Sequence, residues 1–233
     1  MSPTDRRTFL KASANAMGAL GAYSALPAFE LVTPPWVPTD TVRLGVAGCG
    51  PWGRKILDEL DRLGLRDSTA IVFASDHGYH LGEHTFWQKA NLHEEVIRVP
   101  LIMSIPGYEP GKSESIVELV DIYPTLAEVL GFSIPKDVQG TSLLPVLIDN
   151  DAFIKEGALS FQSGASWRED QWSYMLFTDG TDVVYNMEKD PLQFTNQARN
   201  PESAADRARL NKKLLDRLNE TGISRVVKSN KKK

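Results

Sequence analysis

The sequence predicts an α/β fold in which a layered sheet is followed, from about residue 151, by a smaller α+β subdomain. Two short apolar runs, 41–47 and 70–74, are typical of buried strands. Charges at helical spacing over 204–220 predict a helix that packs on one face. A further helix is predicted between the two apolar runs, because one helical face there is made of Ile56, Leu57, Leu60 and Leu63.

The composition is that of a soluble globular protein. The 233 residues are 42% hydrophobic and 24% charged, and the net charge of -4 lacks the basic footprint of a nucleic-acid-binding protein. No apolar run reaches the roughly 18 residues that a membrane-spanning helix needs, so no membrane partner is expected. The single cysteine, Cys49, excludes an internal disulfide framework. The sequence makes no prediction about oligomeric state.

The N-terminus has the pattern of an export signal. Residues 5–11 carry the charges, and the stretch 12–27 is uncharged and rich in Ala, Gly and Leu. We therefore expect a signal peptide over 1–28 and a proline-rich linker over 29–40. Paired arginines before Phe-Leu-Lys resemble the twin-arginine motif, which implies export to the periplasm. The alternative is a short amphipathic helix.

A glycine turn at 48–53 matches the pattern GxGxxG and lies between a predicted strand and a predicted helix. Strand, turn, helix, strand and a following acidic residue, Asp76, are the ordered parts of a Rossmann half. Residues 42–54 resemble the start of the Gfo/Idh/MocA oxidoreductases, and that resemblance implies a nicotinamide cofactor. Pro51 argues against the cofactor, because it removes an amide donor at the helix start. An oxidoreductase fragment is therefore kept as an alternative.

The segment after the second strand carries side chains with metal-binding chemistry. A strand that ends in Asp76-His77-Gly78 places a carboxylate and an imidazole at the carboxyl edge of a sheet, where open α/β folds bind ligands. The Asp76 carboxylate is a hard oxygen ligand that suits calcium or magnesium. Gly78 allows the backbone to turn sharply after the strand.

From residue 53 onward the sequence resembles the sulfatases of the alkaline phosphatase superfamily, and their iduronate-2-sulfatase-like members most of all. The resemblance covers about 53–220 and rests on many motifs in the family's order. These motifs are the run 75–84 (SDHGYHLGEH), Trp87, Lys89, Glu94-Glu95, 98–102 (RVPLI), 120–126 (VDIYPTL), 140–145 (GTSLLP) and 185–191 (YNMEKDP).

The resemblance implies hydrolysis of sulfate esters on a partial alkaline-phosphatase-like layered sheet. A first domain would span 41–150, with an oxidoreductase-like start at 41–54, and a C-terminal subdomain 151–233. Asp76 and His77 would hold a divalent cation, usually calcium, and Lys89 would contact the sulfate group, whose negative oxygens a cation stabilises. The substrate would be a sulfated small molecule or polysaccharide.

Each of these residues also has a plainer interpretation. Asp76 could cap the next turn, His77 could be a core histidine, and Lys89 could be a solvated charge. His77, His80 and His84 invite a zinc interpretation, which is disfavoured without cysteine partners or an HExxH arrangement. Other family motifs need no catalytic role: Asp121 and Pro124 open a helix that Gly131 stops, and Asp190-Pro191 makes a turn after a short strand.

No catalytic nucleophile can be assigned. Sulfatases make a formylglycine from the cysteine of a C-x-P-S-R motif, whereas Cys49 lies in the sequence CGPWGR (49–54). The family's early paired aspartates, its middle lysine and its middle histidine also have no matching positions. Three hypotheses follow: a sulfatase-family hydrolase that lacks the nucleophile, an oxidoreductase fragment, and a non-catalytic binding protein on a sulfatase scaffold.

Overall fold

The computed structural model describes residues 51–223, all within a compact unit that spans Val42–Lys233. The predicted signal peptide, the linker, the strand at 41–47 and Cys49 lie outside the described residues. No helix between residues 51 and 223 combines the length and the apolar character needed to span a bilayer.

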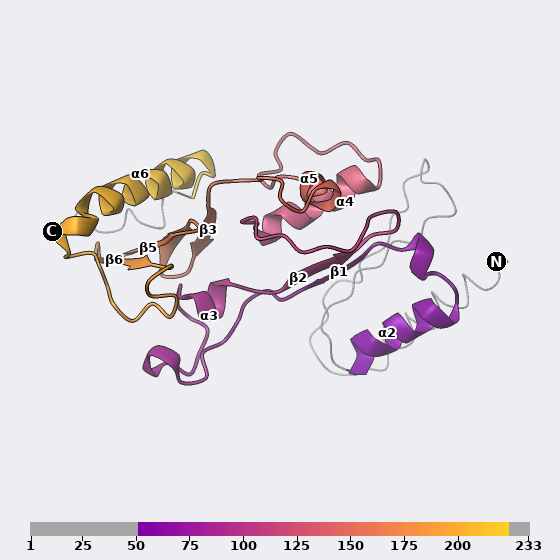
Figure 1. Ribbon diagram of the computed structural model, residues 1–233, viewed down its shortest axis with the longest axis horizontal. Coiled ribbons are helices and arrows are strands. Elements are labelled where there is room, and N and C mark those ends of the chain that lie inside the picture. The colour runs from indigo at the N-terminus through magenta and orange to yellow at the C-terminus, as the bar shows by residue number, and fades with distance from the viewer. Residues whose placement is uncertain (1–50, 224–233) are drawn as a thin grey trace. The chain divides into compact units, whose positions relative to one another are not determined.

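The described part combines helices with two antiparallel sheets, which agrees with the α/β prediction (Figure 1). The α-helices are α2 (Pro51–Arg62), α3 (Glu94–Ile97), α4 (Ile122–Val129), α5 (Leu144–Ile148) and α6 (Ala204–Glu220). Single 3-10 turns are η1 (Arg66–Ser68), η2 (Glu83–Thr85), η3 (Leu119–Asp121) and η4 (Pro201–Ser203). The strands are β1 (Ile71–Ala74), β2 (Leu101–Ser104), β3 (Ala158–Phe161), β4 (Gly164–Arg168), β5 (Trp172–Phe177) and β6 (Asp182–Asn186).

Strand β1 pairs antiparallel with β2, with Ile71 opposite Ser104 and Ala74 opposite Leu101. The strand predicted at 70–74 is found as β1, which begins one residue later, but the prediction that it is buried is wrong, since none of its four residues is fully buried. Ile102 on β2 is 61% exposed, although its side chain is large and apolar. The two strands therefore form a small sheet with apolar surface open to solvent.

The second sheet has the order β3-β4-β5-β6, with every neighbour antiparallel. Helix α6 covers one face with Leu210, Leu214 and Leu218, which recur every four residues and are buried. They pack on the sheet residues Trp167, Trp172, Tyr174 and Val184. Figure 1 shows α6 along one side of this sheet. The predicted helix at 204–220 is thus confirmed with its boundaries.

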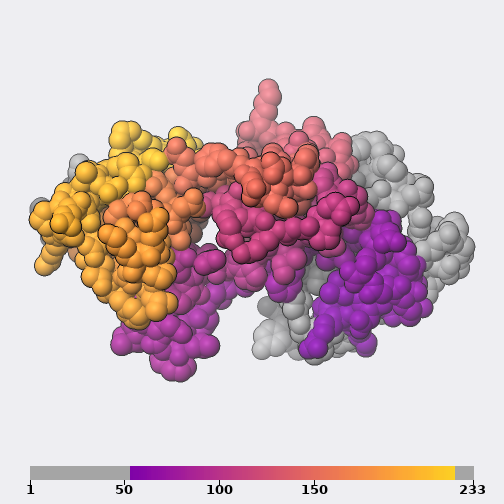
Figure 2. Space-filling view, in the orientation of Figure 1, coloured from indigo at the N-terminus to yellow at the C-terminus, as the bar shows by residue number. Residues whose placement is uncertain are grey.

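The other face of this sheet packs on the segment before α3. Side chains alternate along a strand, so that Tyr174 faces α6 while Met175 faces the opposite side. There Met175 contacts the buried Leu92, with Tyr185 and Met187 alongside. Figure 2 shows this magenta segment against the orange strands. The C-terminal sheet therefore supports the loop that follows β1.

Helix α4 ends as the sequence predicts. Gly131 has φ +72°, a conformation that costs glycine little. Its amide donates to the Glu128 carbonyl at 3.0 Å, and the Phe132 amide donates to the Ala127 carbonyl at 2.7 Å. These two bonds satisfy carbonyl groups that would otherwise be left without partners at the helix end.

Candidate functional site

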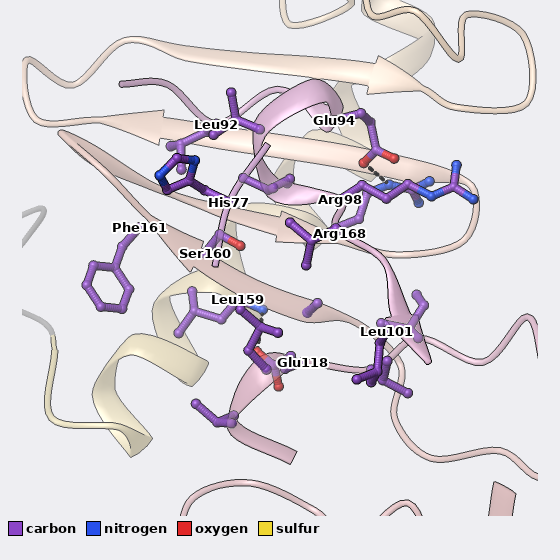
Figure 3. A pocket seen from close by; sticks show the side chains of 18 of the residues that line it. His77, Leu92, Glu94, Arg98, Leu101, Glu118, Leu159, Ser160, Phe161 and Arg168 are labelled. Carbon is purple, nitrogen blue, oxygen red and sulfur yellow. Dashed lines mark hydrogen bonds and ion pairs between the residues drawn. The ribbon is translucent and has the colours of Figure 1, made fainter. Parts of the chain in front are cut away.

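Asp76, His77 and Lys89, the three residues singled out from the sequence, line one pocket of about 820 Å³. Asp76 and His77 follow directly after β1, and Lys89 returns to them from twelve residues further along the chain. Figure 3 shows His77 beside Leu92, on the side of the pocket opposite the guanidinium groups of Arg98 and Arg168.

The turn after β1 is held against α3. The Gly78 amide donates to the Val96 carbonyl at 2.8 Å. A Cβ atom at Gly78 would lie 1.9 Å from the Glu95 carbonyl oxygen, so only glycine permits this approach. Gly78 does not have the positive φ that would favour glycine, so the requirement for glycine in Asp-His-Gly is set by the close approach to α3 and not, as predicted, by the turn.

Helix α3 is in turn fixed to the C-terminal sheet. Gln193 is 1% exposed, and its Oε1 accepts a hydrogen bond from the Glu94 amide at 2.9 Å. Its Nε2 donates to the Ser173 Oγ atom on β5 at 3.0 Å. A continuous chain of contacts thus runs from β5 through Gln193 and α3 to Gly78, and it positions His77.

The hydrogen bonds of His77 determine which ring nitrogen is available. Its Nδ1 lies 2.7 Å from the Gly78 carbonyl oxygen, which can only accept. Nδ1 therefore carries the hydrogen, and in the neutral ring Nε2 keeps its lone pair. Nε2 lies 3.5 Å from Asp76 Oδ2 and 2.7 Å from Lys89 Nζ. Nε2 thus lies close to both a carboxylate and an ammonium group.

A closed loop brings Lys89 to His77. The His80 amide donates to the Gln88 carbonyl at 3.2 Å, and the Gly82 amide donates to the Phe86 carbonyl at 3.0 Å. The Tyr79 hydroxyl also donates to the Trp87 carbonyl, at 2.6 Å. These three bonds fold residues 79–88 back on themselves, and Lys89 comes to lie next to the start of the loop.

The plainer interpretations of Asp76 and His77 do not hold in the structure. Asp76 Oδ1 accepts from the adjacent His77 amide at 3.1 Å and caps none of the described helices. The His77 side chain is 33% exposed at the pocket wall, so it is not a core histidine. The Lys89 side chain is exposed, and its ammonium lies 2.7 Å from His77 Nε2.

Sequence reasoning missed a second charged group in the pocket. The Arg168 Nε atom donates to Glu94 Oε1 at 2.7 Å, and both side chains line the pocket with Arg98 (Figure 3). Glu94 lies within a motif that the sequence singled out, but its partner lies 74 positions away. No spacing in the sequence could have indicated this pair.

The three histidines considered for zinc do not meet at one site. His77 lines the pocket, whereas His80 is fully buried in a histidine cluster with His84 and His93. The rings of His84 and His93 stack with centroids 4.2 Å apart. Between residues 51 and 223, no set of three or more histidine, cysteine, aspartate or glutamate side chains is arranged to hold a metal ion.

The comparison with known families settles which family this is. The family described as N-sulphoglucosamine sulphohydrolase, C-terminal, matches residues 82–220, more than half of the chain. The chain belongs to the sulfatase family. Proteins of this family generally use a metal ion. The match begins after Asp76 and His77 and includes Lys89.

Sulfatases are also found among the similar proteins. A choline-sulfatase from Rhizobium meliloti is 33% identical over 165 residues, which are 67% of this chain and 32% of the relative. An arylsulfatase K from Mus musculus is 32% identical over 62% of this chain and 29% of the relative. The chain thus spans about a third of the length of these curated relatives.

A solved structure extends the likeness to the fold. That protein, in complex with its substrate D-glucosamine-2-N,6-O-disulfate, superposes with a TM-score of 0.70 at 26% identity. The superposition covers 76% of this chain and 40% of the other. The predicted alkaline-phosphatase-like sulfatase fold is thereby confirmed for the described part.

The donor set fits part of a metal site. Asp76 supplies a carboxylate at the pocket wall whose side chain is 86% exposed to solvent, and His77 supplies the Nε2 lone pair, because its Nδ1 hydrogen is donated to the Gly78 carbonyl. Ligating histidines commonly donate their other ring N–H to a backbone carbonyl in this way. Two donors converge here, so a complete coordination sphere needs further ligands.

Proposed function

We propose that this chain contributes metal-binding and sulfate-binding residues to a sulfuric ester hydrolase. The observation that carries the proposal is the meeting of Asp76, His77 and Lys89 in one pocket, in a chain of the sulfatase family. A carboxylate, an imidazole lone pair and an ammonium group at this spacing suit a divalent cation next to an anionic ester.

In this proposal Asp76 and His77 hold calcium through Oδ and Nε2. Calcium takes about 6–8 ligands, mostly oxygens, so two protein donors predict weak binding, with a Kd on the order of 10⁻⁴–10⁻³ M. A bound cation would polarise the sulfate oxygens and favour an ionised nucleophile. Lys89 carries an ammonium that would bind the sulfate group and stabilise the negative charge that grows on its oxygens.

The proposed substrate is a sulfated small molecule or polysaccharide. The names of the relatives point to different alcohols, since one is a choline-sulfatase and the structural neighbour binds a doubly sulfated glucosamine. Acidic and basic side chains both line the pocket, among them Glu94, Glu118, Arg98 and Arg168. Such a wall suits a polar sulfated molecule. Twin-arginine export to the periplasm remains part of this proposal.

Binding tests the proposal directly. The full chain should bind calcium and inorganic sulfate in calorimetric titrations, and the double variant Asp76→Ala, Lys89→Ala should lose both. A matched control is Lys136→Ala, Asp137→Ala, which removes an exposed acid and an exposed lysine outside the pocket lining. Loss of binding in the control, or its retention in the double variant, would refute the assignment.

We expect the 233-residue chain by itself to hydrolyse no sulfate ester. No C-x-P-S-R motif occurs in the 233 residues, and activated nucleophiles supply much of the rate enhancement in ester hydrolysis. Release of the phenol from an aryl sulfate should therefore equal the buffer rate, even with calcium and a formylglycine-generating enzyme. A wild-type rate above that of Asp76→Ala, Lys89→Ala would reveal an active site built from other residues.

The missing motif also favours a second candidate, a non-catalytic binding protein on a sulfatase scaffold. The two candidates share the binding residues and differ in whether a nucleophile ever reaches the pocket. Addition of a polypeptide that carries a formylglycine and the first part of a sulfatase fold should restore turnover only for the hydrolase.

A further inference from the structure

We propose that Lys89 and the metal ion compete for the same lone pair of His77, so that cation binding releases Lys89 to bind the sulfate group. The inference rests on the proposed function, because it concerns regulation within the same site. It assigns Lys89 two alternative partners in place of a fixed contact with the substrate.

The ring of His77 leaves room for only one partner at Nε2. The Gly78 carbonyl at 2.7 Å uses the hydrogen on Nδ1, so the remaining acceptor is the single lone pair of Nε2. The Lys89 ammonium lies 2.7 Å from that nitrogen, within hydrogen-bond distance. A coordinating cation needs the same lone pair, so the two contacts exclude each other.

Lys89 can leave His77, whereas the guanidinium of Arg168, on the opposite side of the pocket (Figure 3), is held in place. Arg168 is bound by Glu94 through Nε at 2.7 Å. Among residues 51–223 no carboxylate forms an ion pair with Lys89, whose side chain is exposed and lines the same pocket. Its backbone stays fixed, since the Lys89 carbonyl accepts from the Asn91 amide at 2.9 Å. The ammonium can therefore move into the pocket while the loop stays closed.

The exchange couples the two ligands. With His77 Nε2 taken by the cation, all three donors of the Lys89 ammonium become available to an anion. Binding linkage is reciprocal, so calcium should tighten sulfate binding by the same factor by which sulfate tightens calcium binding. A site with Lys89 as a fixed ligand of sulfate would couple the two ions only through their direct attraction, which does not need the exchange at His77.

Calcium titration of the full chain tests the competition. Lys89→Met keeps most of the side-chain volume and removes the competing donor, so we expect its dissociation constant for calcium to fall roughly tenfold below that of the wild type. The matched control is Arg98→Met, which removes one positive charge from the same pocket without a contact to His77. It should bind calcium within about twofold of the wild type.

Salt separates direct competition from general repulsion. Charges that repel through solvent are screened over about 10 Å at 0.1 M salt and about 3 Å at 1 M. The advantage of Lys89→Met should therefore persist at 0.5 M sodium chloride. In the wild type, calcium should also tighten the binding of inorganic sulfate, and this dependence should be smaller in Lys89→Met, which keeps only the direct attraction between the two ions.

The outcomes separate the two proposals. Calcium binding by Lys89→Met that is no tighter than that of the wild type, or an advantage that disappears in high salt, overturns the competition and leaves the metal site standing. Absence of calcium binding in the wild type, in Lys89→Met and in Asp76→Ala alike overturns the metal site and the competition together.

Discussion

Asp121 is the buried charge on which the middle of the chain depends. Its carboxylate is fully buried and accepts from the Thr141 amide, the Glu118 amide and Lys155 Nζ, each at 2.7 Å. The sequence indicated Asp121 as the start of a helix, and the structure adds that one carboxylate joins three segments. Its role is structural, in agreement with the sequence interpretation.

Lys155→Met should destabilise the protein by roughly 3–5 kcal/mol, because it leaves the Asp121 charge buried without its partner. The Lys155 side chain is 14% exposed, so solvent compensates little. Denaturant unfolding followed by circular dichroism measures the loss. Lys112→Met removes a lysine paired with Glu114 at the surface and should change stability by less than about 1 kcal/mol. Equal effects of the two variants would contradict the assigned role of Asp121.

At the scale of elements, helix α6 is the part that the sequence described best. Leu210, Leu214 and Leu218 recur at the helical period and all lie against the C-terminal sheet. Its remaining surface carries ion pairs, of which Arg207 with Asp182 is held by two bonds at 2.7 and 2.8 Å. Burial of the leucine stripe therefore supplies most of the stabilisation from this helix.

Leu214→Ala should destabilise the protein by about 2–5 kcal/mol, since it leaves a cavity between α6 and the sheet. The neighbouring Leu215 is 38% exposed and points away from the stripe, so Leu215→Ala should cost less than about 1.5 kcal/mol. Thermal or denaturant unfolding compares the two variants. A larger loss for Leu215→Ala would show that the packing face of α6 is wrongly assigned.

The histidine cluster is the element with the clearest dependence on pH. Burial, with a further contribution from the charge of His84, lowers the pKa of His93 to about 4 from its usual 6.5. Glu95 acts in the opposite direction, and His80 adds to the lowering. Between pH 6.5 and pH 4 the unfolded chain therefore binds more protons at this position than the folded chain.

The contribution of the neutral, buried His93 to the free energy of unfolding should be fully present above pH 6.5. It should be lost as the pH falls towards about 4. Denaturant midpoints of the wild type and of His93→Phe, measured at pH 7 and pH 4.5, isolate this contribution from that of the carboxylates. With allowance for solvent screening, we expect the wild type to lose roughly 1–2 kcal/mol more than the variant. Parallel losses in both proteins would exclude His93 as the cause.

At the scale of the whole molecule, the described residues leave apolar surface exposed on the small sheet that precedes the candidate site. Strands β1 and β2 pair only with each other among residues 51–223, and Ile102 is 61% exposed on that sheet. A two-stranded sheet is marginally stable in water, and open apolar edges favour association. The chain spans about a third of the length of its curated relatives, so much of their fold has no counterpart in it.

The oxidoreductase alternative makes a prediction for the whole chain. The glycines at 48–50 lie outside the described residues, whereas α2 begins at Pro51, which has no amide hydrogen to offer a pyrophosphate. We expect no saturable binding of NAD or NADP in calorimetric titrations of the full chain. Micromolar binding that Gly50→Val abolishes would restore the oxidoreductase interpretation.

The sequence by itself determined the local features of this protein. The four-residue leucine period of α6, the glycine that ends α4 and the order of the Asp-His-Gly and Lys89 motifs are all properties of neighbours along the chain. Hydrophobic period and turn chemistry act over a few residues, so they can be read without knowledge of the fold. The family followed from the order of the same motifs.

Only the tertiary structure decided how distant residues meet. The pair of Glu94 with Arg168 and the bridge from Gln193 to Ser173 join positions with no periodic relation in the sequence. The contact of Lys89 with His77 depends on the closure of the loop at 79–88, and the same closure buries His80 away from the pocket. Such contacts arise from the packing of the segment before α3 on the C-terminal sheet, where burial of Leu92 and Met175 fixes the geometry that no local pattern encodes.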